Sequence, residues 1–276
     1  MINKLLTISL LILFTITFSA CEDKKSNSQV NKEKKEVKFT PKLKIPEWDE
    51  DGGKKIWNTY KNWHDAKHDP IPAMKIGYAY SEELHDYKKA FEWFKYANSM
   101  IPLGENSYFA CYALQQLKRY DEAISWCNNA IELKWDKALY QLATVYYKKK
   151  DFNNALIWFT KAYEKGEKTA ITSLGLANEK IGNYKEAENW YKIGIKESNI
   201  NSYHNIGRFY FYIMKDNLRA SAYAIALIDK EYTKSSVLKV LQKEWKIPNE
   251  TIKKGYELQL NSPEFPIHYD GKLDLK

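Results

Sequence analysis

The sequence predicts an all-α protein in which paired helices stack side by side into a solenoid. One motif, an alanine followed three residues later by an aromatic residue, recurs five times, and its leading residues are Ala90, Ala123, Ala155, Ala187 and, in a degraded copy, Ala220. Successive alanines are 33, 32, 32 and 33 residues apart, which is the length of one helical hairpin. Within each unit, apolar residues recur at three- and four-residue spacing, as on one face of a helix. Stacked hairpins present a long binding surface instead of a catalytic pocket.

The unit from Asp136 to Gly166 shows the pattern most plainly. A first helix is expected over about 137–149, and Asp151 is a suitable N-cap for a second helix that Gly166 ends. The residues expected to face inward are Leu139, Leu142, Ala143 and Tyr146 from the first helix and Ala155, Trp158, Phe159 and Ala162 from the second. We expect the recurring tryptophans to pack between helices, so Trp158→Ala should cost about 3 to 5 kcal/mol.

The first twenty residues have the features of an export signal. Lys4 supplies a positive charge, and residues 5–18 form an uncharged, mostly apolar run that is short for a transmembrane helix. Phe18-Ser19-Ala20-Cys21 resembles the lipobox of bacterial lipoproteins, although Phe18 stands where leucine is usual. The resemblance implies that residues 1–20 are a lipoprotein signal peptide and that Cys21 carries acyl chains that anchor the protein to a membrane. An ordinary secretory signal with an incidental cysteine is the alternative.

Residues 21–48 are expected to form a lipidated, flexible tether. Positions 22–48 hold eight lysines and five acidic residues with few large apolar groups, so they cannot bury enough surface to offset the entropy lost on ordering. The lipoprotein resemblance implies a place in the bacterial cell envelope, facing the periplasm, at the inner or the outer membrane.

The charge balance argues against nucleic acid as a partner. The formal net charge is +8, but only three basic residues are arginine, and the lysines are scattered through the repeats. Sequence-specific nucleic-acid readers use arginine forks and clustered charge. A membrane, by contrast, is expected as a partner through the lipid anchor.

The repeats resemble tetratricopeptide repeats in their length and in the pattern of leucine and a small residue, as in Leu174-Gly175, followed by an alanine in the second helix. The run Trp158-Phe159-Thr160-Lys161-Ala162 is also similar to Sel1-type repeats. Both families share the helix-turn-helix unit, and the resemblance implies a right-handed α-solenoid over residues 71–230.

Further elements are expected at both ends of the array. Residues 49–70 are predicted to hold an N-terminal capping helix, and residues 231–261 two C-terminal capping helices, because the last repeat would otherwise expose its apolar face. Pro248 is expected to stop the first of these helices and Asn249 to cap the second. Residues 262–276 are predicted to be an extended tail that folds back along the array.

Cys111 and Cys127 are candidates for a disulfide. They occupy the small position and the aromatic position of one repeat, which elsewhere hold a facing pair such as Ala143 and Phe159. Disulfides persist in exported proteins, but two buried free thiols would fit the same slot. Either arrangement would be structural.

The sequence gives no reason to expect an enzyme, a metal or a cofactor. It holds no Gly-x-Ser-x-Gly elbow, no His-Glu-x-x-His motif and no phosphate-binding glycine loop. His64 and His68 would share a helix face but have no third ligand nearby.

The candidate site is the concave surface of the array. In tetratricopeptide-like units, residues of the first helix that flank its small position face this groove. Counted from Gly77, Cys111, Ala143, Gly175 and Gly207, they are Tyr78, Tyr108, Tyr112, Gln115, Tyr140, Thr144, Tyr147, Thr172, Glu179, His204, Arg208 and Phe211. Tyrosine and arginine are enriched at protein-binding hot spots, so a protein partner is expected here.

The family resemblance suggests what that partner is. Small exported lipoproteins built from Sel1-like repeats include immunity proteins, which neutralise phospholipase or other toxins that reach the periplasm, and this is the function we expect. A scaffold for envelope assembly or trafficking is the main alternative. A cell-wall-related enzyme of the Sel1 type is a minor one, since those proteins carry a cysteine pair in each repeat and this chain has one pair.

Overall fold

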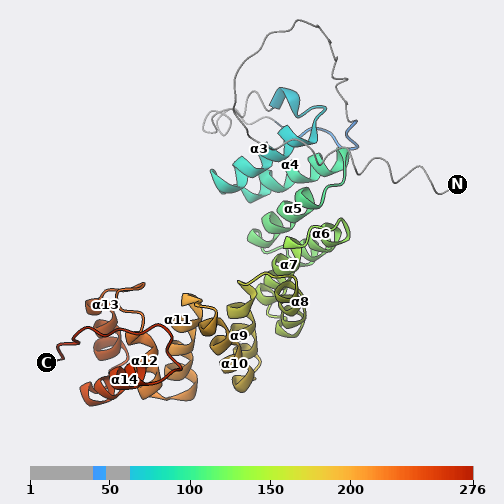
Figure 1. Ribbon diagram of the computed structural model, residues 1–276. Helices are drawn as coiled ribbons and strands as arrows, with labels where there is room; N and C mark the ends of the chain where they lie inside the picture. The colour runs from blue at the N-terminus through green and yellow to red at the C-terminus, as the bar shows by residue number, and fades with distance from the viewer. Residues whose placement is uncertain (1–39, 48–62, 276) are drawn as a thin grey trace, which may run out of the picture. The chain divides into compact units, whose positions relative to one another are not determined.

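The computed structural model describes residues 40–47 and 63–275, and in those residues the secondary structure is helical (Figure 1). They contain no β-strand, only an isolated bridge between Ile228 and Tyr232. The helices form hairpins, α3 (Pro70–Glu82) with α4 (Tyr87–Met100), α5 (Gly104–Gln116) with α6 (Tyr120–Glu132), α7 (Lys137–Lys148) with α8 (Phe152–Glu164), and α9 (Ala170–Lys180) with α10 (Tyr184–Lys196). The fifth hairpin joins α11 (Ile200–Phe209) and the π-helical segment η1 (Tyr210–Met214) to α12 (Asn217–Ile225).

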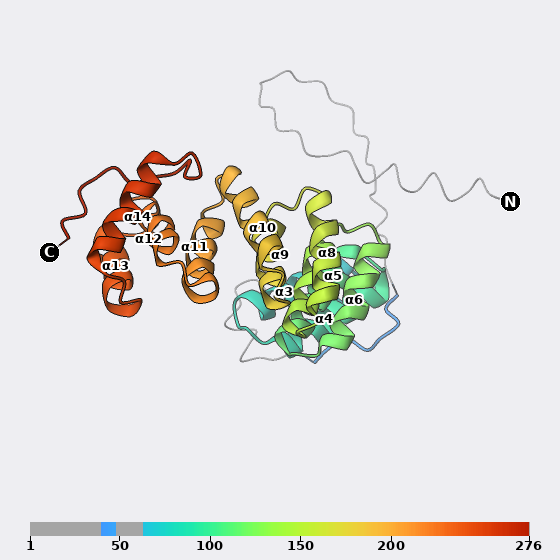
Figure 2. The ribbon, with the colours of Figure 1, turned by 90° about the horizontal axis from the view of Figure 1, so that it is seen from below.

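From α3 to α12 each helix packs against the next helix in the chain, and first helices of successive hairpins also touch, as α5 touches α7 and α9 touches α11. The chain is therefore an all-α solenoid of tandem hairpins. Figure 2 shows α11 to α14 grouped at the C-terminal end of this succession. Within the described residues no helix is long and apolar enough to cross a bilayer.

The turns inside the hairpins share one conformation. The residue before the N-cap of the second helix has a positive φ, for example Lys150 (φ 66°) before Asp151 and Gly182 (φ 81°) before Asn183. Asp151 caps α8 as expected, because its side chain accepts a hydrogen bond from the backbone N–H of Asn154. This turn reverses the chain within three residues and so fixes the two helices of a hairpin as antiparallel neighbours.

In four of the five hairpins a small residue of the first helix faces a large aromatic residue of the second, and in the remaining hairpin Cys111 faces Cys127. A side chain on Gly77 would meet the ring of Phe94 at 2.8 Å, and one on Gly175 would overlap the ring of Tyr191. The inward residues of the second helices, Phe94, Cys127, Phe159, Tyr191 and Tyr223, are all buried. Close helix approach at these positions therefore depends on the small residue.

The tryptophans of the motif are less buried than the sequence predicts. Trp93 is 1% exposed, but Trp158 and its equivalents in α6 and α10 are only partly buried. The residue that follows each tryptophan is the one that faces the first helix. The tryptophan precedes it by one residue, so its side chain points about 100° away around the helix axis. Trp158 packs at the junction of two core clusters, with Lys161 Nζ 4.0 Å from its ring centroid.

The end of the array is closed by helices and by the tail. α13 (Lys234–Lys239) continues into η2 (Val240–Glu244), and α14 (Asn249–Asn261) packs against α12. The expected capping role of Asn249 is wrong: Asn249 is the first residue of α14, the N-cap is Pro248, and the Asn249 side chain accepts a hydrogen bond from Gln242 at 2.8 Å.

Residues 262–275 are extended and fold back over α11, α12 and α14. Phe265 is buried with its ring centroid 4.6 Å from that of Tyr223. The backbone N–H of Ile267 donates to the Tyr203 hydroxyl at 2.9 Å, and the Gln259 side chain bonds both the N–H and the carbonyl of Tyr269, at 2.8 and 2.7 Å. The tail thus covers apolar surface that the last hairpin would otherwise expose.

Most of the predicted N-terminal features lie outside the described residues. These include the signal peptide over residues 1–20, the lipidation site Cys21 and most of the tether and of the N-terminal capping helix. Of the tether, residues 40–47 are described, and Ile45 packs against the first core cluster. That part of the segment is in contact with the array instead of being free of it.

Candidate functional site

The predicted surface residues fall at three equivalent positions of the first helices. Relative to the small residue, these are the third residue before it, the residue after it and the fourth residue after it. The residue directly after the small one is never buried, and it is Tyr78, Tyr112, Thr144, Leu176 and Arg208 in the five hairpins. Tyr78, at 49% exposed, is the most open tyrosine of this row. We refer to this row, together with the partly buried Tyr108, Tyr140 and Tyr147 beside it, as the tyrosine surface.

The tyrosines of this surface are held by ring contacts with their neighbours. Tyr112 lies edge-on to Tyr87 at 6.1 Å, and Tyr140 lies 5.3 Å from Phe159. The Tyr140 hydroxyl also bonds Ser173 of the next first helix at 3.0 Å. Burial, with smaller contributions from nearby acidic groups, raises the pKa of Tyr108 and Tyr147, so both stay neutral hydrogen-bonding groups at neutral pH. Fixed rings with a polar tip bind partners with little loss of side-chain entropy.

Two of the predicted surface residues are buried, so the expectation that they face a partner is wrong. Gln115 accepts a hydrogen bond from Gln141 of α7, and Thr172 bonds Ser202 of α11 at 3.1 Å. Both side chains lie between successive first helices, where buried polar groups need partners of their own. They join neighbouring hairpins instead of contacting a ligand.

Phe211 also differs from its expected place. It lies in η1, and its ring stacks on Trp245 with the centroids 4.4 Å apart and the planes at 7°. The contact links the last hairpin to the C-terminal helices. Phe211 is therefore partly buried against Trp245 and is not an open part of the predicted surface.

Two neighbouring hollows lie at the C-terminal end of the tyrosine surface. The larger, called here the apolar pocket, has a volume of about 410 Å³ and is lined by Tyr203, His204, Gly207, Arg208, Tyr212, Ala224, Leu227, Tyr232, Ser236, Val237, Val240, Glu244 and Trp245. The smaller, the polar pocket, has a volume of about 280 Å³ and is lined by Tyr147, Leu176, Glu179, Lys180, Asn205, Arg208, Phe209 and Tyr212.

Arg208 and Tyr212 belong to both hollows and form the partition between them. The guanidinium carbon of Arg208 lies 5.9 Å from the centroid of the Tyr212 ring. Burial and the positive charge of Arg208 lower the pKa of His204, which faces the apolar pocket, so this imidazole is neutral at neutral pH. Of the predicted residues, Tyr147, Glu179, His204 and Arg208 line the two pockets.

Sequence reasoning missed most of the apolar pocket. Its walls include Tyr212, Val240 and Trp245, which lie in or next to the two π-helical segments, where helical periodicity does not hold. The only signal in the sequence is the cluster Tyr210-Phe211-Tyr212, with more aromatic residues than one helix face needs.

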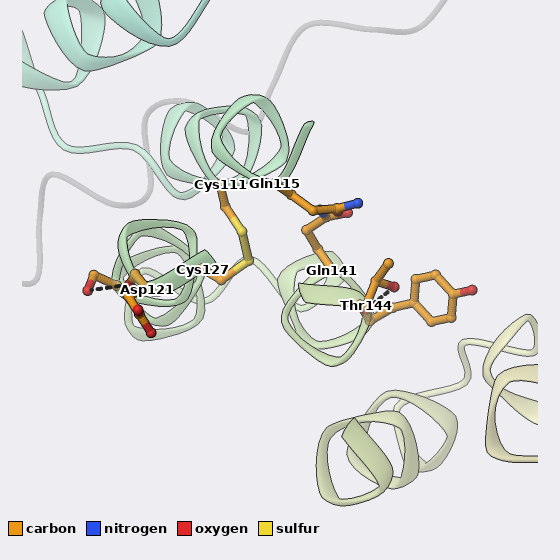
Figure 3. Close-up of a disulfide and its surroundings, with 8 residues drawn as sticks. Cys111, Gln115, Asp121, Cys127, Gln141 and Thr144 are labelled. Atoms are coloured by element: carbon orange, nitrogen blue, oxygen red, sulfur yellow. Dashed lines mark hydrogen bonds between the residues drawn. A yellow bond between two sulfur atoms is a disulfide. The ribbon is translucent and has the colours of Figure 1, made fainter. Parts of the chain in front are cut away.

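The structure places a disulfide between Cys111 of α5 and Cys127 of α6, with the Cα atoms 5.3 Å apart (Figure 3). Both residues are fully buried. Figure 3 shows the bridge beside the Gln115 and Gln141 side chains, which connect α5 to α7. The second hairpin is thus joined covalently within itself and by a buried amide pair to the third.

In the described part of the chain, no three His, Cys, Asp or Glu side chains come together as metal ligands would. The family model of the tetratricopeptide repeat matches residues 110–134 and 136–164, which correspond to parts of the second and third hairpins. No curated protein matches the chain. The matched repeats make the molecule a helical scaffold for protein–protein interaction, a class that is typically not enzymatic.

Proposed function

We propose that this protein is an immunity protein, held at a membrane by a lipid on Cys21 and facing the periplasm, that binds and neutralises a secreted antibacterial toxin such as a phospholipase. The observation that carries the proposal is the tyrosine surface on tetratricopeptide repeats, which follows an N-terminal segment with the features of a lipoprotein signal. An inhibitor anchored in this way is located at the membrane that such a toxin attacks.

The arrangement of the tyrosines supports a folded, rigid partner-binding face. Rings such as Tyr112 and Tyr140 are already packed on neighbouring aromatic residues and helices. A face that is ordered before binding loses little conformational entropy when it binds. An inhibitor that must capture a toxin quickly benefits from this property.

Co-expression tests the proposal. A candidate toxin encoded beside the gene is directed to the periplasm of a sensitive host, with and without this protein. We expect growth to be restored only with the protein, and we expect Cys21→Ser to abolish incorporation of a labelled fatty acid and to weaken protection.

A pull-down from membranes gives the independent readout. Recovery of the toxin supports the proposal. Recovery of outer-membrane or secretin assembly components, with no protection from any neighbouring toxin, would show that the protein is an envelope assembly scaffold instead.

A further inference from the structure

We propose that the apolar pocket receives a large apolar side chain of the protein partner and that Arg208, at its edge, binds the carboxylate of an acidic residue next to that side chain. The inference rests on the proposed function as a protein binder and specifies the chemistry that the partner must carry at one end of the binding surface.

The apolar pocket is large enough to hold a large anchoring side chain, and its lining is mostly apolar. Its volume of about 410 Å³ lies in the range of pockets that enclose small ligands. Apolar walls come from Leu227 in the turn after α12, from Val237 in α13, from Val240 in η2 and from Trp245 directly after η2. A buried aromatic or large aliphatic anchor in such a pocket is the usual centre of a protein interface.

Arg208 differs from the other two arginines of the chain. Arg119 forms an ion pair with Glu122 at 2.6 Å, and Arg219 forms one with Asp216 at 3.2 Å. Among the residues that the structure describes, no carboxylate lies within ion-pair distance of Arg208, which instead rests against the Tyr212 ring. A guanidinium oriented by an aromatic ring is well placed to bind a carboxylate with two hydrogen bonds.

The surrounding charges place the carboxylate on the side of the polar pocket. Glu244 lines the apolar pocket and would repel a second carboxylate there, and His204 is neutral. The polar pocket also holds a carboxylate, that of Glu179, which accepts a hydrogen bond from Tyr191 at 3.1 Å, but Lys180 and Arg208 together give this pocket a net positive charge, whereas in the apolar pocket Glu244 balances Arg208. The apolar anchor and the acidic residue therefore fall on opposite sides of Arg208, as adjacent residues of one chain can.

The two π-helical segments shape this site. Tyr212 comes from η1, and Val240 and Glu244 come from η2, so each segment contributes to the wall. Such segments are rare and are often found at functional sites. The stack of Phe211 on Trp245 ties them together, so the pocket is formed before a partner arrives.

A displayed library of random 12-residue peptides tests the inference without bias toward any chemistry. The library is selected on the protein purified from cells that express the full-length chain, and enriched peptides are measured by fluorescence anisotropy. We expect the enriched peptides to share a large apolar residue next to Asp or Glu. Arg208→Gln should weaken their binding about tenfold or more, since it removes a charged hydrogen-bonding partner.

The matched control is Arg219→Gln, which removes an arginine that also lies against a tyrosine ring but lines neither pocket. It should change binding less than about twofold. Ala224→Phe, which fills the apolar pocket from a partly buried position, should abolish binding, with circular dichroism and melting curves used to confirm that the variant folds.

The inference is wrong if no peptide is enriched, if enriched peptides lack the apolar and acidic pair, or if Arg208→Gln and Arg219→Gln bind them equally. None of these results decides whether the protein protects against a toxin, which the co-expression experiment tests separately. Loss of toxin protection with intact peptide selectivity would instead reject the immunity function and keep this binding chemistry.

Discussion

The ring of Tyr191 lies directly over the backbone of Gly175, so closely that a Cβ atom at Gly175 would overlap three carbon atoms of the ring. The Tyr191 hydroxyl donates to Glu179 at 3.1 Å, one turn further along the same first helix, which holds the ring in place. Burial, together with the nearby Glu179 carboxylate, raises the pKa of Tyr191 well above its usual value, so the phenol stays a donor.

This contact predicts that Gly175→Ala destabilises the protein, although alanine is the better helix former by about 1 kcal/mol. Overpacking against Tyr191 should cost more than that gain and leave a net loss of about 1 to 2 kcal/mol in the free energy of unfolding, measured with urea. Gly207 is the matched control, because a Cβ there would meet Tyr223 at an ordinary 3.4 Å. Gly207→Ala should be neutral or stabilising, and equal effects of the two substitutions would contradict the explanation.

The bridge between Cys111 and Cys127 is expected to stabilise the second hairpin. The cysteines are 16 residues apart in sequence, and closing a loop of that length contributes on the order of 3 kcal/mol. Reduction should raise the intact mass by about 2 Da and lower the melting temperature. The variant with Cys111→Ala and Cys127→Phe, which copies the pair Ala143 and Phe159, should be more stable than the variant with alanine at both positions. An unchanged mass on reduction would show that the bridge is absent.

The two kinds of tryptophan position should differ in stability. Trp93 is fully buried, so Trp93→Ala should cost about 3 to 5 kcal/mol in the free energy of unfolding. Trp158 is partly exposed and covered by Lys161, so Trp158→Ala should cost less, about 1 to 2 kcal/mol. Thermal and urea unfolding of the two variants compare them directly, and a larger loss for Trp158 would argue against this assignment of the inward slot.

The tyrosine surface predicts which substitutions weaken partner binding. Tyr112→Ala and Tyr140→Ala should each weaken it by about 2 kcal/mol in calorimetry with the partner recovered from membranes. Tyr184 is the control, since it is exposed but lies on a second helix outside the surface. Tyr140→Phe separates binding from packing, because it keeps the ring against Phe159 and loses only the bond to Ser173. Unaltered affinity in both alanine variants would show that the partner binds at another surface of the protein.

Glu188 is expected to make the stability of the C-terminal hairpins depend on pH. Burial opposes its ionisation, but hydrogen bonds from Lys192 at 2.6 Å and from the Tyr210 hydroxyl at 2.7 Å outweigh burial and lower its pKa below the usual 4.5. A carboxyl group with a lowered pKa stabilises the fold above its usual pKa, and this stabilisation is lost as the pH falls through the folded-state value.

Glu188→Gln should therefore reduce stability at neutral pH by about 1 kcal/mol and lose less than the wild type on acidification below pH 4.5. Urea unfolding at a series of pH values measures this slope. Glu186→Gln, on the exposed face of the same helix, is the control and should follow the wild-type curve.

Much of the hairpin architecture could be predicted because it is a local property of the chain. The spacing of the alanines predicted the hairpins, and Asp151 predicted where α8 begins. The position of Cys111 in its repeat indicated that Cys127 lies beside it. The candidate surface was less predictable. Tyr78 and Arg208 are exposed as expected, but Gln115 and Thr172 are buried, because a polar side chain on a first helix can point to a partner or to the next first helix.

The sequence by itself determined that this chain repeats one helical hairpin and which residue of each helix is small, because spacing along a helix sets which side chains share a face. Only the tertiary structure decided how the last hairpin meets the C-terminal helices. There the π-helical segments shift the register of the helix faces and bring Phe211 against Trp245, which creates the apolar pocket beside Arg208. Contacts between segments far apart in sequence depend on that shift of register, and the shift cannot be predicted from the repeat spacing.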